Sequence, residues 1–116
     1  MNKEFIPYEE ALAMKELGFD EFTVAAYVDN ELDVGGLWKD SVKSKVIHKA
    51  PLFQQAFRWF RDKYKLYHTI AKTGSIFMCT IDLNNWTDKV NTYEEAELNC
   101  LRKLIEIINQ NKDEKY

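Results

Sequence analysis

The feature that most constrains the fold is a one-sided aromatic run in the middle of the chain. Its members recur at intervals of three and four residues, the repeat of one face of an α-helix: Phe53, Phe57, Phe60 and Tyr64. Pro51 suits the first turn of such a helix, where a missing N–H costs nothing. The opposite face is polar: Gln54, Arg58, Arg61 and Asp62. The pattern predicts an amphipathic helix over residues 51–64 that buries its aromatic face against a second layer.

Two further helices are predicted from their end signals. Pro7 starts the first and Gly18 stops it after Leu17, in a stretch rich in good helix formers. Thr92 with Glu95 three residues later forms a capping box and starts the last helix. We expect a frayed polar tail from about residue 110.

Short β-branched and aromatic segments between the helices predict strands. These lie at residues 22–28, 32–34, 66–70 and 75–83. Asp29-Asn30 predicts a turn after the first, and residues 72–74 predict a tight hairpin between the last two. Residues 39–50 are interpreted as a loop with a short extended piece, and 86–91 as a polar connection. The chain is therefore predicted to be a single α+β domain (residues 1–116), a two-layer structure with an antiparallel sheet of about four strands packed by three helices.

Composition fits a small soluble protein. The chain has 116 residues, of which 46% are hydrophobic and 30% charged, enough for one core beneath a solvated surface. No apolar run approaches the ~20 residues of a membrane span, and the first residues lack the apolar stretch of a signal peptide. We expect a cytoplasmic protein without a membrane partner.

The two cysteines do not form a metal-binding motif. Cys79 and Cys100 have no CxxC spacing, and His48 and His68 are the only histidines, so neither a metal site nor a cofactor is predicted. Both cysteines fall among apolar residues and are interpreted as small buried hydrophobic side chains. A bridge between them is disfavoured in a reducing compartment.

The sequence favours binding over catalysis, because the familiar catalytic and phosphate-binding fingerprints are absent. One enzymatic alternative stays open. His48 and His68 would act as base and acid of a metal-independent phosphodiesterase, with Lys45 or Lys49 stabilising the transition-state charge. That mechanism requires the two imidazoles to meet.

Charge is distributed unevenly beneath the net value of −3. Residues 1–40 have a balance of −7, residues 41–72 of +7 and residues 73–116 of −3. One aromatic ring and four cations in or beside the basic segment suit a phosphate-bearing ligand: Trp38, Lys45, Lys49, Arg58 and Arg61. The pI of about 5.4 argues against duplex DNA as a partner, whereas a small anion needs only a few such groups. A surface that binds a protein is the alternative.

Three segments carry a family resemblance. They are Glu10-Ala-Leu-Ala-Met-Lys-Glu-Leu-Gly-Phe-Asp-Glu21, the segment from Ala50 to Tyr64 (APLFQQAFRWFRDKY) and the segment from Thr92 to Ile107 (TYEEAELNCLRKLIEI). Together they resemble the hallmark blocks of a family of short proteins encoded by tailed phages of Bacteroidota, including crAss-like phages, and by related mobile elements. Asn99 stands where the family pattern has Ala, and Phe22-Thr23 where it has Pro-Cys.

The resemblance implies a context rather than a mechanism. The family has no established activity, so no catalytic residue carries over. It implies a small accessory protein in the cytoplasm of an infected bacterial host. By analogy with small phage proteins that sequester cyclic nucleotide signals as oligomers, we expect a non-enzymatic homo-oligomer that binds such a ligand. A module that inhibits a host protein is the other expectation.

Overall fold

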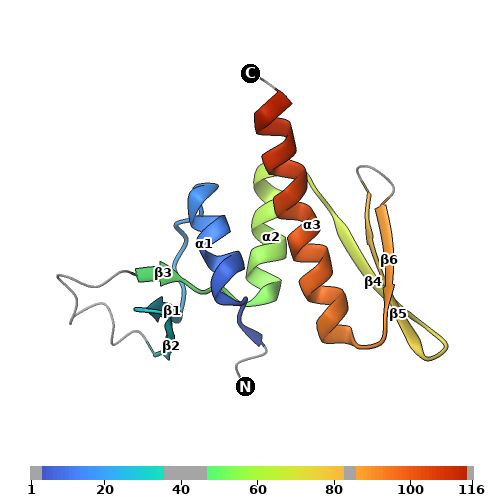
Figure 1. The fold of residues 1–116 in the computed structure, drawn as a ribbon, viewed down its shortest axis with the longest axis horizontal. Helices are drawn as coiled ribbons and strands as arrows, with labels where there is room; N and C mark the ends of the chain where they lie inside the picture. Colours follow the sequence, from blue (N-terminus) through green and yellow to red (C-terminus); the bar gives the residue numbers. More distant parts are fainter. Residues whose placement is uncertain (1–3, 36–46, 83–85, 115–116) are drawn as a thin grey trace. The chain divides into compact units, whose positions relative to one another are not determined.

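The computed structural model describes residues 4–35, 47–82 and 86–114. Along the chain its elements are α1 (Tyr8–Glu16), β1 (Ala25–Val28), β2 (Glu31–Val34), β3 (Ile47–Lys49), α2 (Phe53–Tyr64), β4 (His68–Thr73), β5 (Ile76–Ile81), β6 (Trp86–Val90) and α3 (Tyr93–Glu114) (Figure 1). They belong to two compact units, residues 1–56 and 57–116, and the boundary falls within α2. None of the helices in the described ranges is long and apolar enough to cross a bilayer.

The predicted α+β class is confirmed, but the single sheet of about four strands is not. The described strands form two three-stranded antiparallel sheets, in the orders β2-β1-β3 and β4-β5-β6. One of the strands missing from the prediction is β6, which is largely polar. Its side chains nevertheless alternate between half-buried and exposed along Trp86–Val90, the two-residue period of a strand.

The first unit is organised around β1. Asp29 and Asn30 link β1 to β2 with φ angles of 52° and 76°, which confirms the predicted turn and matches the backbone of a two-residue hairpin. β3 pairs with the other edge of β1, and α1 contacts β3. Ala25 and Ala26 on β1 are both fully buried, so this central strand is covered on its two faces.

The second unit is a three-stranded meander with α3 packed against it. The turn between β4 and β5 contains Gly74 at φ +64°, close to the hairpin that residues 72–74 predict. α3 contacts all three strands (Figure 1). Cys79 and Ile81 on β5 are fully buried, as are Cys100 and Leu101 on α3. The predicted burial of both cysteines is confirmed.

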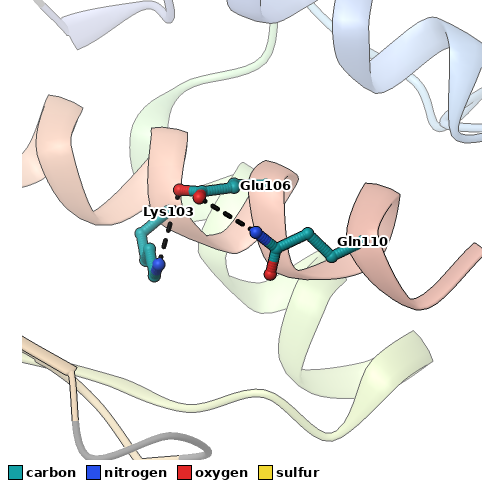
Figure 2. A network of polar contacts seen from close by, with 3 residues as sticks. All are labelled: Lys103, Glu106 and Gln110. Atoms are coloured by element: carbon teal, nitrogen blue, oxygen red, sulfur yellow. Dashed lines mark hydrogen bonds and ion pairs between the residues drawn. The ribbon is translucent and has the colours of Figure 1, made fainter. Parts of the chain in front are cut away.

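Thr92 caps the start of α3 at the position that the sequence predicts, and Glu95 contacts the Thr92 hydroxyl rather than the Thr92 N–H of a full capping box. The Glu95 N–H donates to Thr92 Oγ1 at 3.1 Å, and the Thr92 hydroxyl donates to Glu95 Oε1 at 3.1 Å. Figure 2 shows a contact network on the same helix, in which Glu106 accepts from Lys103 Nζ at 3.4 Å and from Gln110 Nε2 at 3.2 Å. Such exposed pairs contribute little, so the buried apolar residues of α3 supply most of its stability.

The aromatic face of α2 is buried as predicted. Phe53, Phe57 and Phe60 are at most 7% exposed, and Tyr64 is half-buried. Arg58 on the opposite face is exposed. The aromatic side chains of α2 therefore belong to the hydrophobic core, and the cation on the opposite face, Arg58, is accessible to solvent or a ligand.

Candidate functional site

The candidate site is a cavity of about 410 Å³ in the first unit, where the end of α1 approaches β3. It combines apolar side chains with two lysines and one aspartate, and is lined by Ala11, Lys15, Gly18, Phe19, Asp20, Ile47 and Lys49. Its volume lies within the roughly 300–1,000 Å³ of small-molecule sites. It is therefore large enough for a ligand of small-metabolite size.

The end of α1 builds one wall. Gly18, at φ +100°, allows the chain to reverse: its N–H donates to the Lys15 carbonyl at 3.0 Å, and the Phe19 N–H donates to the Met14 carbonyl at 3.0 Å. This pair of bonds is a Schellman motif, which explains why the predicted glycine stop ends the helix. The reversal places the buried Phe19 at the cavity beside Lys15, which lies in the last turn of α1.

The outer edge of β3 builds the other wall. The Ala50 N–H donates to the Ala25 carbonyl. The main-chain groups of the preceding residue, Lys49, therefore point away from β1, and those of Ile47 do likewise. The Ile47 carbonyl accepts a hydrogen bond from Lys15 Nζ at 3.2 Å. Lys15 thus bridges α1 to this strand edge, which lacks a strand partner within the described residues.

Two ammonium groups consequently reach the same cavity. Lys49 Nζ donates to the Asp20 carbonyl at 2.7 Å, and Lys15 Nζ to the Ile47 carbonyl. An ammonium has three N–H donors, so each lysine can also donate to a bound anion. The Asp20 carboxylate reduces the local charge, which leaves a balance of about one positive charge among the lining side chains. The site suits an anion of low charge attached to an apolar body.

His48 lies beside this site within the same sheet. It pairs with Tyr27 across β1 and β3, and its ring meets the Tyr8 ring edge-on at 5.5 Å. Its Nδ1 is buried without a hydrogen-bond partner in the described part of the chain. Burial, and secondarily the charge of Lys15, lowers the pKa of His48. Both effects favour the neutral form of the imidazole.

His68 belongs to the second unit. Its ring stacks on Phe57 with centroids 3.7 Å apart and an interplanar angle of 17°. Burial, followed by the charge of Arg61, lowers the pKa of His68 to about 4. A general acid must hold a proton at the working pH, so the lowered pKa values of both histidines disfavour the acid half of the phosphodiesterase mechanism.

The five predicted ligand residues are distributed along the chain. Trp38 and Lys45 lie outside the described residues. Lys49 lines the cavity. Arg58 and Arg61 belong to the second unit, and because they are three residues apart on α2 they lie on the same side of that helix. Arg58 is exposed and Arg61 half-buried.

Sequence reasoning missed Lys15. A lysine in the last helical turn is explained by the helix dipole alone, so its type and position gave no sign of a cavity. Only its hydrogen bond to residue 47, 32 positions away, reveals the site. The described residues contain no group of three or more His, Cys, Asp or Glu side chains placed to hold a metal ion.

Comparison with known proteins identifies no relative. No protein-family model, curated protein or solved structure proved similar to the chain.

Proposed function

We propose that the protein is a non-enzymatic binder that sequesters a small anionic ligand in the cavity between α1 and β3. The observation that supports this best is the convergence of the Lys15 and Lys49 ammonium groups on one cavity. Ammonium groups bind phosphate as point charges, and apolar walls such as Phe19 suit the uncharged body of a ligand. A nucleotide combines both chemical features.

The proposed ligand class is a cyclic nucleotide signal of host anti-phage defence. This part of the proposal draws on the resemblance to the phage-encoded family, which implies the cytoplasm of an infected host. It also draws on the analogy with small phage proteins that sequester cyclic nucleotides as homo-oligomers. The other residues that the sequence predicts as ligand contacts stay predictions: Trp38, Lys45, Arg58 and Arg61. The proposal needs neither a metal nor a cofactor.

A depletion experiment tests the proposed function. The purified protein is incubated with cyclic di- and trinucleotides, the free nucleotides are quantified by chromatography, and the protein is then heated to release what it bound. Depletion followed by recovery of the intact nucleotide supports sequestration. No depletion of any nucleotide refutes the proposed ligand class. Recovery of a cleaved product supports the phosphodiesterase alternative instead.

Substitutions test the position of the site. Lys15→Gln and Lys49→Gln each remove one charged hydrogen-bond donor, and we expect roughly 10- to 100-fold weaker binding from either. Lys89→Gln is the matched control, because Lys89 is exposed on β6 and the change in net charge is the same. Equal weakening in the control would mean that net charge, rather than the cavity, governs binding.

An exposed aromatic residue favours a protein-binding module as the second candidate function. Phe22 is 66% exposed and Val24 is 48% exposed just before β1. Gln55 holds this segment by donating to the Phe22 carbonyl at 2.8 Å. Large exposed rings contribute strongly to protein interfaces. A host protein retained by the wild type and lost with Phe22→Ser would support this candidate, while retention of the same proteins by both would refute it.

A further inference from the structure

The first sheet has a second edge, formed by β2, on the side opposite the cavity. The strand order β2-β1-β3 puts β3, which lines the cavity, on one side of β1 and β2 on the other (Figure 1). Within the described residues, no strand pairs with the outer edge of β2. A hollow of about 460 Å³ adjoins this strand and the turn before it, lined by Val28, Asp29, Glu31, Leu32 and Asp33.

The register of the β1–β2 hairpin shows which main-chain groups of β2 point outward. The Gly35 N–H donates to the Val24 carbonyl at 2.7 Å. Because hydrogen-bonded positions alternate along an antiparallel pair, residues 31, 33 and 35 bond to β1. The N–H and carbonyl groups of the residues between them, Leu32 and Val34, therefore point away from β1. They are free of the β1 ladder and can bond to an added strand.

The two faces of this edge differ in chemistry, because side chains alternate along a strand. Leu32 and Val34 lie on one face, and Val34 is 51% exposed. Glu31 and Asp33 lie on the other face, where Glu31 is exposed and Asp33 half-buried. An added strand would therefore meet apolar side chains on one face and two carboxylates on the other.

We propose that the outer edge of β2 binds an extended segment of another protein as an added antiparallel strand, in which Lys or Arg alternates with apolar residues. Strand addition of this kind uses main-chain hydrogen bonds for affinity and alternate side chains for specificity. The apolar residues of the segment pair with Leu32 and Val34. Its cations lie opposite Glu31 and Asp33, and opposite charges stabilise cross-strand pairs.

Charge makes a second copy of β2 a poor occupant of the same edge. In the antiparallel register that pairs Leu32 with Val34 of a second copy, Asp33 lies opposite the second copy's Asp33. Like charges directly opposite one another destabilise a strand pair. The proposal is independent of the anion-binding function, because the cavity lies at the other edge of the sheet.

The test titrates the capped peptide Lys-Val-Lys-Val-Lys into the full chain and follows each amide by NMR hydrogen exchange. We expect slower exchange at the Leu32 and Val34 amides, which face the peptide, and no change at Asp33, whose N–H already bonds to β1. Methylating the main-chain nitrogens of both peptide valines removes the N–H groups that face β2 and should abolish binding. Methylating those of the lysines, which face away from β2, should preserve it.

A pair of double variants tests the charge pairing. Glu31→Gln with Asp33→Asn should weaken peptide binding about tenfold, since two exposed ion pairs are lost. Asp82→Asn with Glu94→Gln is the matched control, because both residues are exposed in the second unit and the change in net charge is the same. The control should bind the peptide as the wild type does.

Four results would each overturn the proposal. They are binding of the valine-methylated peptide, unchanged exchange at the Leu32 and Val34 amides, and equal weakening in the two double variants. The fourth is protection of these amides without peptide that increases with protein concentration, which would mean that a second copy occupies the edge.

Discussion

The sharpest test of the second unit concerns the pH dependence of stability at His68. This imidazole stacks on Phe57, and its pKa is lowered from 6.5 to about 4, chiefly by burial and then by Arg61. Because the folded-state pKa lies below the unfolded one, protons bind preferentially to the unfolded chain. The contribution of His68 to stability is therefore complete above pH 6.5 and is lost as the pH falls from 6.5 toward 4.

The magnitude follows from the two pKa values. At pH 5 the unfolded imidazole is almost fully protonated and the folded one mostly neutral, which corresponds to a loss of about 2 kcal/mol relative to pH 8. The ring is only partly buried, so solvent screening reduces the expected loss to about 1 kcal/mol. His68→Phe keeps a flat ring against Phe57 and removes the titration.

Urea denaturation followed by circular dichroism measures the effect at pH 8 and pH 5. We expect the wild type to lose about 1 kcal/mol more than His68→Phe between these pH values. His48 is present in both proteins, so its own titration cancels in the comparison. His68→Gln is a second variant that removes the titration without the ring, and its pH dependence should match that of His68→Phe. An equal loss in the wild type and both variants would refute the assigned pKa and its cause.

Two further predictions concern local signals that the structure confirms. Thr92→Ala removes the hydroxyl that caps α3 and should lower the free energy of unfolding, measured by urea denaturation, by about 1 kcal/mol. Thr92→Ser keeps the hydroxyl and should keep the wild-type stability. Identical losses in the two variants would contradict the capping role. Asn30 has φ 76°, a backbone conformation that a β-branched residue adopts poorly. Asn30→Val should therefore lower the free energy of unfolding by about 1 kcal/mol or more and lower the Tm, whereas Asn30→Gly should leave both almost unchanged. Equal Tm values for the two variants would mean that this turn is not strained.

Part of the candidate site was accessible from sequence. Lys49 was predicted as a ligand residue because it stands in the basic segment, and it does line the cavity. Its partner Lys15 lies in the acidic third of the chain, where one cation among many carboxylates gives no signal. The two meet because β3 pairs with β1 and leaves its outer edge toward α1, a placement that depends on strand pairing. Neither composition nor local charge predicts that pairing.

The sequence by itself determined the three helices, the end of α1, the start of α3, the β1–β2 turn and the burial of the α2 aromatic face and both cysteines. It did not determine the end of α3, which continues to Glu114 where a frayed tail was predicted from about residue 110. These features depend on residues a few positions apart, whose capping, backbone preference and periodicity act within the segment itself. Only the tertiary structure decided that the strands form two sheets, that the polar segment Trp86–Val90 is one of those strands, and that Lys15 and Lys49 share a cavity. Such contacts join segments far apart in the chain, and their free energy depends on which surfaces become buried together.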